Sequence, residues 1–440
     1  MTDITRRKLL GYGALGGASL LGSGLLNPAF AQQAALSFKP EPGASLRVLR
    51  WKEFVAGDNT QFQENAKKFT ELTGVPVRID REPWEDVRPK SAVAANVGSG
   101  PDIVINVFED PHQYPDKLVD LTDLAEYLGN KYGGWYPVAR TYGTRNGKWI
   151  GLPLGVAGSP LNYRISSIRK AGFDKVPTDL PNFLKLCQNL KRNGTPAGFA
   201  LGHAIGDANC WCYWLLWAHG ATVVDKNDNV TINTPETIAA LEYGKQLYDT
   251  MIPGTASWLD PSNNKVYLDG QLHLTNNGVS IYYAAKNSPD AKLREIAEDT
   301  DHAPFPAGLS GEVAEYPLFS QAWIFNYSKF PNAAKEFLRF MWEKDQYETW
   351  QQASLGYITQ TLKAYEDNPI WTSDPKLAVF KGATARMRHA SYPGTLGYAS
   401  SAVLAEWVVV DMVADATVGG RSAKEAAQRA QARAERIYRG

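Results

Sequence analysis

The segment that decides the fold is WIGLPLGVAGSPLNYR, residues 149–164. Its two ends are apolar runs of strand length, and between them lie Gly155, Gly158 and Pro160. Because glycine and proline interrupt regular structure, this spacing predicts that the chain leaves one sheet here and enters another. We expect the two glycines to absorb backbone rotation at this crossover.

Apolar strand-like runs alternate with amphipathic helix-like runs on both sides of this segment. The predicted strands are 46–51, 75–79, 103–107, 149–154 and 161–164, and the predicted helices are 60–73, 84–96, 332–342, 423–438 and one that opens at Thr234. This alternation is typical of a parallel sheet that carries helices on both faces. We therefore expect an α/β fold.

Four stretches, in this order along the chain, resemble the motifs of one family. They are FTELTGVPV (69–77), GSGPDIV (98–104), GKWIGLPLGV (147–156) and SKFPNAAKEFL (328–338). On these residues the chain resembles the periplasmic extracellular solute-binding proteins of ABC importers, in their carbohydrate-binding, maltose-binding-protein-like cluster. The resemblance implies a two-lobed periplasmic binding protein fold with three interlobe crossovers and a ligand cleft.

The resemblance also implies how the chain divides. Lobe one is expected at 45–157 plus 306–354, and lobe two at 158–305 plus 355–440. The crossovers are then expected near 156–161, 303–306 and 354–357. A leader at 32–44, rich in proline, is expected to have no fixed structure.

The first 31 residues read as a signal peptide. Arg6, Arg7 and Lys8 precede an apolar, glycine-rich run, and Ala29-Phe30-Ala31 has the small-residue pattern of a cleavage site. The adjacent arginines favour a twin-arginine signal, with an ordinary signal peptide as the alternative. We expect cleavage after Ala31 and a periplasmic protein.

Composition narrows the function. The 46 basic and 46 acidic residues cancel, so nothing favours nucleic acid or a membrane surface. The three cysteines, Cys187, Cys210 and Cys212, form no CxxC pair, and no HExxH occurs, so we expect no metal and no cofactor. A disulfide among these cysteines stays open. Residues 225–236 imitate a calcium loop, but Val230 replaces the glycine at its sixth position, which favours a hairpin turn.

Ligands of open α/β sheets bind beyond the carboxyl ends of the strands, so polar and aromatic residues that follow strands are candidates. Carboxylates and amides suit hydroxyl groups, and aromatic planes suit the C–H face of a sugar. The candidate ligand-binding residues are Trp51, Glu53, Glu109, Asp110, Arg164, Asp207, Trp211, Trp258, Asp260, Asn277, Gln321 and Tyr398. For the tryptophans the alternative is core packing, and for the carboxylates it is helix capping. Trp258 is expected to face the cleft, with Asp260 beside it.

The sequence and the resemblance together predict a soluble substrate-binding component of an ABC importer, which captures a sugar, polyol or glycoside and meets membrane permease subunits. An anionic ligand, such as a glycerophosphate or sugar acid held by Arg164, is the alternative. No GxSxG motif is present, and the adjacent Glu109 and Asp110 do not form a glycosidase pair, so we expect no enzyme. A secreted glycoside hydrolase is the less favoured reading. A monomer is expected.

Overall fold

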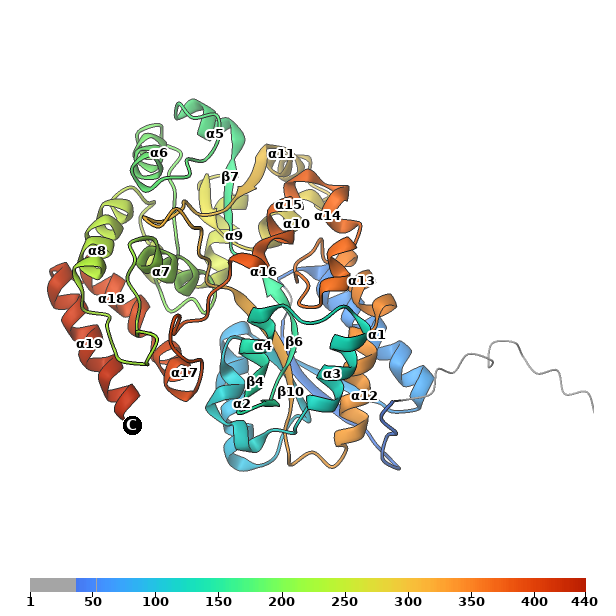
Figure 1. Cartoon of the computed structure of the whole chain (residues 1–440). Coiled ribbons are helices and arrows are strands. Elements are labelled where there is room, and N and C mark those ends of the chain that lie inside the picture. Colours follow the sequence, from blue (N-terminus) through green and yellow to red (C-terminus); the bar gives the residue numbers. More distant parts are fainter. Residues whose placement is uncertain (1–36, 53) are drawn as a thin grey trace, which may run out of the picture. The chain divides into compact units, whose positions relative to one another are not determined.

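The computed structural model describes residues 37–52 and 54–440 (Figure 1). The predicted signal peptide and the candidate Glu53 lie outside the described residues. The end of the predicted leader is bound to the fold: the Glu41 carboxylate accepts hydrogen bonds from the Asn332 and Ala333 N–H groups, at 2.9 and 3.1 Å. Glu41 thus satisfies donors in the first turn of a helix, which have no partner within that helix.

The largest sheet of the described residues has five strands in the order β2-β1-β3-β10-β6. Its strands are β1 (Leu46–Trp51), β2 (Val77–Glu82), β3 (Ile103–Val107), β6 (Leu152–Ala157) and β10 (Leu318–Ile324). β1 pairs in parallel with β2 and β3, whereas β10 runs antiparallel to β3 and β6. The α/β class is confirmed, but the prediction of a parallel sheet is wrong for β10. This strand enters from the opposite direction because the chain returns from the other sheet.

Helices cover both faces of this sheet. They are α1 (Ala56–Thr73), α2 (Trp84–Val97), α3 (Thr122–Lys131), α4 (Pro137–Gly143), α12 (Pro331–Trp342) and α13 (Lys344–Ala353). In Figure 1, α1, α3 and α12 lie on one side of β6 and β10, and α2 and α4 lie on the other. The short strands β4 (Thr144–Arg145) and β5 (Lys148–Trp149) form a hairpin beside them.

The end of α1 shows why the sequence sets these boundaries. Gly74 follows the helix at a φ of 76°, and its N–H donates to the Thr70 carbonyl. Only glycine adopts this left-handed conformation readily. The following strand begins at Val77 rather than at Val75, because Pro76 has no N–H to donate to a neighbouring strand.

The second sheet has three strands in the order β8-β7-β9. β7 (Leu161–Arg164) runs antiparallel to both β8 (Leu274–Asn276) and β9 (Thr300–Ala303). The helices between these strands are α5 (Ile165–Lys170), α6 (Leu180–Arg192), α7 (Asp207–Ala218), α8 (Pro235–Tyr248), α9 (Asp260–Leu268), α10 (Ser280–Lys286) and α11 (Ala291–Asp299). Every residue of α7 is buried, so this helix is the centre of its lobe.

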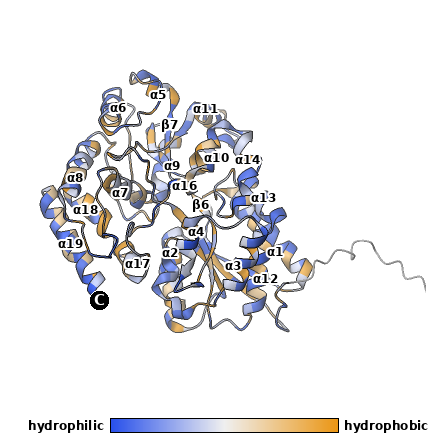
Figure 2. Cartoon of the chain, viewed as in Figure 1, coloured by the Kyte–Doolittle hydropathy of each residue, from blue (hydrophilic) through white to orange (hydrophobic). Residues whose placement is uncertain are grey.

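The chain after Ala353 contributes mainly helices. They are α14 (Ile370–Ser373), α15 (Ala378–Lys381), α16 (Ala383–Arg386), α17 (Tyr398–Ala405), α18 (Val408–Thr417) and α19 (Ala423–Arg439). α18 contacts α7, α8 and α19. Four alanines of α19 are buried while its other face is polar, as the colours of Figure 2 show. The predicted helix at 423–438 is confirmed, and its amphipathic pattern has the expected cause.

Three segments join the two sheets, and they fall close to the predicted crossovers. The first runs from β6 to β7, and the second runs from β9 to β10. The third passes beside the first, since Val156 and Thr359 exchange two backbone hydrogen bonds of 2.8 Å. A Cβ atom added to Gly155 would lie 1.7 Å from the Ile358 side chain and 2.8 Å from the Thr359 carbonyl oxygen. Gly155 therefore permits the close approach of two crossovers, and its part in a rotation stays a prediction.

Candidate functional site

A partly open pocket lies where the two sheets and their crossovers meet. The space between its lining atoms, open solvent included, is about 350 Å³. The lining from the five-stranded lobe and the third crossover is Phe54, Trp84, Ala157, Leu318 and Tyr357. The lining from the other lobe is Asp207, Asp260, Asn264, Asn277, Gly278 and Ser280. One wall is therefore aromatic and apolar, and the facing wall is polar.

The aromatic wall is fixed by its own packing. Trp84 is the first residue of α2 and comes directly after β2, at the carboxyl end of the sheet. Its ring meets Trp51 edge-on at 5.2 Å and Phe54 edge-on at 5.4 Å between centroids. Trp84 is only 6% exposed. Perpendicular aromatic contacts of this kind hold the indole in one orientation.

The polar wall is built on the first turn of α7. Asp260, the first residue of α9, accepts a hydrogen bond from the Asp207 N–H at 2.7 Å and from the Gly206 N–H at 3.1 Å. A helix N-terminus stabilises a carboxylate in this place. Asp207 in turn accepts a hydrogen bond from the Asn263 side chain at 2.7 Å. The two carboxyl groups are thus held together at the pocket.

A network of side-chain amides continues this wall. The Asn277 amide donates to the carbonyl oxygens of Asn264 and Asn263, at 2.6 and 3.0 Å. The Ser280 hydroxyl donates to Asn277 at 2.7 Å, and the Asn264 amide donates to Ser280 at 2.8 Å. Because each group is oriented by its neighbours before any ligand arrives, little ordering remains to be done on binding.

Burial and mutual repulsion shift the acids of this wall. Burial raises the pKa of Asp260 to about 6, against the opposing effect of the α7 amides. Burial, followed by the charge of Asp260, raises the pKa of Asp207 well above its usual range. Two carboxyl groups in one dry site do not both ionise readily. Among the described residues, no lysine or arginine lines the pocket to offset them.

The structure brings some predicted site residues to this pocket. Asp207, Asp260 and Asn277 line it. Trp51 lies behind Trp84 and supports that ring. Glu53 lies outside the described residues.

Four other candidates do not line the pocket. Arg164 lies over the Tyr267 ring at 5.1 Å and is 3.9 Å from Asp299. The Trp211 indole donates to the Ala200 carbonyl at 2.6 Å inside the core. Trp258 packs, half-buried, against the cluster of Tyr267, Leu272 and Ile281. Tyr398 is 59% exposed, in a separate surface depression beside the C-terminus.

The remaining candidates lie at the other end of the interlobe contact. Asp110 accepts hydrogen bonds from Arg88 and Asn106, at 2.7 and 2.8 Å. The Gln321 amide donates to the Phe108 carbonyl at 2.6 Å. Glu109 forms the seam described below. Contact of all these residues with a ligand stays a prediction.

Sequence reasoning missed Trp84, Phe54, Tyr357, Asn264 and Ser280. Trp84 had a weak signal, since it lies five residues after the strand predicted at 75–79, whereas the observed strand extends to Glu82. Phe54 had the same signal after the first strand. Tyr357 had none, because a crossover carries no periodic pattern.

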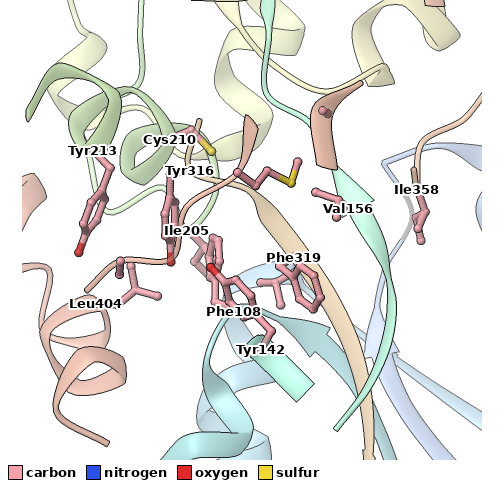
Figure 3. Close-up of a cluster of buried hydrophobic side chains, with 14 of the residues drawn as sticks. Phe108, Tyr142, Val156, Ile205, Cys210, Tyr213, Tyr316, Phe319, Ile358 and Leu404 are labelled. Carbon is pink, nitrogen blue, oxygen red and sulfur yellow. The ribbon is translucent and has the colours of Figure 1, made fainter. Parts of the chain in front are cut away.

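Glu109 joins the lobes through a buried aromatic seam. Its carboxylate accepts hydrogen bonds from the Tyr316 hydroxyl at 3.2 Å and from the Ala390 N–H at 3.3 Å, and its carbonyl accepts from Ser401. In Figure 3, Tyr316 lies between Tyr213 and Phe108. The centroid of the Tyr316 ring is 4.7 Å from that of Tyr213 and 5.1 Å from that of Phe108. Burial raises the pKa of Glu109 to about 7. The Glu109 carboxyl group in this seam is therefore protonated when the pH is below neutral.

Glu109→Gln is expected to remove a pH dependence of stability. Because the folded pKa is raised, the contribution of Glu109 to the free energy of unfolding falls as pH rises from about 4.5 to about 7, by about 1–3 kcal/mol. The buried His112 and His302 and the half-buried His389 have pKa values lowered to about 4, so they act in the opposite direction up to about pH 6.5. In urea unfolding from pH 5 to 8, the free energy of unfolding of the variant should therefore rise relative to that of the parent protein as the pH rises. A constant difference would contradict this assignment.

Other chemistry finds little support in the part of the chain that the structure describes. Its cysteines, Cys187, Cys210 and Cys212, are buried and free. No cluster of three or more acidic, histidine or cysteine side chains could hold a metal ion there. Asp225 accepts the Asn227 and Asn229 N–H groups in a hairpin turn, as predicted. Every helix of the described residues is too short or too polar to cross a membrane.

Known proteins resemble this chain in sequence. A curated relative from Brucella abortus (strain 2308), named only as a binding protein, is 21% identical over 299 residues, which cover 67% of this chain and 71% of the relative. A protein of Deinococcus radiodurans named "Probable ABC transporter-binding protein" is 24% identical over 264 residues, covering 57% of this chain and 61% of that protein.

Solved structures resemble it in fold. A maltose-bound MalE3 of T. maritima superposes with a TM-score of 0.76 at 18% identity, over 90% of this chain and 100% of that one. A solute-binding protein of Agrobacterium radiobacter K84 in complex with ribitol gives a TM-score of 0.74 at 16% identity, over 91% and 100% of the two chains. Both support the two-lobed fold. Residues 64–379 match the family of bacterial extracellular solute-binding proteins, and the chain therefore belongs to that family.

Proposed function

We propose that this protein is the substrate-binding component of an ABC importer and captures a small sugar, polyol or glycoside. The observation that carries the proposal is the pair of unlike walls, one aromatic and one polar, that line one pocket. Asn264, Asn277 and Ser280 offer amide and hydroxyl groups in fixed orientations, which suit ring hydroxyls. Trp84 and Phe54 offer faces for C–H groups. A sugar ring needs both.

The relatives support this proposal without deciding the ligand. The Deinococcus relative is named for an ABC transporter, and the two solved proteins hold maltose and ribitol. A permease in the membrane, a monomeric state and a periplasmic location belong to the same proposal.

The twin-arginine signal is also part of the proposal. The double substitution Arg6→Lys with Arg7→Lys should leave the precursor in the cytoplasm, and unimpaired export of this variant would contradict a twin-arginine signal.

The anionic alternative loses the residue that suggested it. Arg164 lies against Tyr267 and Asp299 instead of the pocket, and the pocket's own charged groups are acidic. A phosphate or carboxylate group in the pocket would lie close to the acidic side chains of Asp207 and Asp260.

The hydrolase alternative gains no support. Incubation of the protein with oligosaccharides should release no new reducing ends.

A thermal-shift screen tests the proposal. Free sugars, polyols, glycosides, sugar acids and sugar phosphates are added one at a time to the mature protein. A cognate ligand at 100 times its dissociation constant should add about 2.7 kcal/mol to the free energy of unfolding. Stabilisation by phosphates or sugar acids alone would contradict the proposal. Asn264→Ala should reduce the shift, because it removes one hydroxyl partner from the wall.

A further inference from the structure

The pocket holds negative charge that no described side chain neutralises. Asp207 is 4% exposed, and Asn263 donates to one of its carboxyl oxygens. Among the described residues, no hydrogen-bond donor reaches the other oxygen, Oδ1, although Asp207 lines the pocket. This oxygen is therefore available to a ligand. A donor that reaches it from the pocket gains more than at an exposed site, because the Asp207 side chain is buried.

Asp260 and Glu85 add to the negative charge. Both Asp260 oxygens accept backbone N–H groups at the start of α7, and no lysine or arginine of the described residues lines the pocket beside this carboxylate. Glu85, next to Trp84, lies close enough to repel Asp260, and its Oε1 is buried without a hydrogen bond. Two acidic side chains thus line the pocket, and the charge of a third, Glu85, acts on one of them. The ionised form of each would gain from a positive charge placed in the pocket.

The buried cations of the adjoining lobe are already engaged. Arg50 is paired with Asp58, and Arg88 is paired with Asp110 at 2.7 Å. Neither guanidinium lines the pocket. The counter-charge for Asp207 and Asp260 does not come from them.

The facing wall also suits a cation. Trp84, Phe54 and Tyr357 present three aromatic rings to the same space. Ring faces attract ammonium groups, and the attraction increases when water is excluded. The Trp84 indole N–H lies close enough to Asp260 to lower the pKa of that carboxyl, although it forms no hydrogen bond of normal geometry with a described residue.

We propose that the ligand carries a protonated amine beside its hydroxyl groups, as an amino sugar or an aminopolyol does, with the ammonium between the Asp207 and Asp260 carboxyl groups and the Trp84 face. This inference rests on the proposed function and names its ligand class. The hydroxyl groups bind the wall of Asn264, Asn277 and Ser280. A neutral sugar fills the same space but leaves two acids competing for one proton. An ammonium lets both acids ionise, and its binding then releases a proton.

Matched ligands test the inference by titration calorimetry at pH 7 and low salt. Each pair differs only in one amine: glucosamine and glucose, galactosamine and galactose, mannosamine and mannose, glucamine and sorbitol. The amine of the cognate pair is expected to bind at least about tenfold more tightly than its neutral partner, as charge pairing in a buried site implies. N-acetylglucosamine controls for the nitrogen itself, since it keeps the nitrogen at the same position and loses the charge.

Two variants assign the effect to the pocket. Asp207→Asn keeps the shape and the acceptor for Asn263, and it should abolish the preference for the amine while neutral binding persists. Asn264→Ala is the matched control, because it removes a hydroxyl partner without changing charge and should weaken both members of a pair by a similar factor. Melting curves of the free variants show whether each one is folded.

The outcomes separate the two proposals. Tighter binding of the amine, lost in Asp207→Asn but not in Asn264→Ala, supports the inference. If neutral sugars or polyols bind as tightly as their amines, the inference is overturned and the proposed function stands. If no member of any pair binds, the proposed function is overturned and the inference with it.

Discussion

Asp58→Ala is expected to lower the free energy of unfolding by about 3–5 kcal/mol, because it leaves a buried guanidinium without its counter-charge. Arg50 is 1% exposed and Asp58 is fully buried. Asp58 accepts a hydrogen bond from Arg50, and its other oxygen accepts one from the Trp350 indole at 2.8 Å. Denaturation in guanidinium chloride, monitored by tryptophan fluorescence, measures the loss.

A double variant separates the lost pair from the orphaned charge. Arg50→Met with Asp58→Ala removes both charges and should be more stable than Asp58→Ala alone, because no uncompensated cation remains. Asp58→Asn keeps an acceptor for Trp350 and should fall between the two. A loss of only about 1 kcal/mol in Asp58→Ala, the size of an exposed pair, would mean that water reaches this site.

Trp84→Ala is expected to weaken binding of the cognate ligand about ten- to a hundredfold. The change removes the aromatic face of the pocket, worth about 1–3 kcal/mol of contact. It also removes the ring that packs against Trp51 and Phe54, so the melting temperature should fall. Calorimetric titration at a temperature where the variant is folded separates affinity from stability.

Trp258→Ala is the matched control for this change. Trp258 is a half-buried tryptophan of the other lobe that lies outside the pocket. Its removal should lower stability while leaving the affinity of the folded protein unchanged. The opposite pattern, weak binding by Trp258→Ala and normal binding by Trp84→Ala, would favour the cleft position predicted from the sequence.

The sequence predicted the local elements better than their arrangement. Strands at 46–51, 103–107 and 161–164 end at the predicted residues, although only the run at 103–107 is almost wholly apolar. The antiparallel direction of β10 could not be read from its sequence. Strand direction depends on where the chain returns from, which is a long-range property.

The site was predictable only where one rule applied, namely that ligands of open α/β sheets bind beyond the carboxyl ends of the strands. Asp207, Asp260 and Asn277 precede or follow regular elements at the edge of a sheet, and they line the pocket. Arg164 satisfied the same rule, yet its side chain turns to Tyr267. The rule locates the backbone and leaves the direction of the side chain open. Which acids lack a counter-charge depends on contacts between distant residues such as Arg88 and Asp110.

The two hydrogen bonds between Val156 and Thr359 have a mechanical consequence. They tie two of the three crossovers into a narrow ribbon, and the missing side chain at Gly155 keeps that ribbon flat against Ile358. A flat ribbon bends easily across its thin dimension and resists shearing along its length. If the two lobes open, we therefore expect this joint to bend about one axis. Both walls of the pocket would then meet in the same register when it closes.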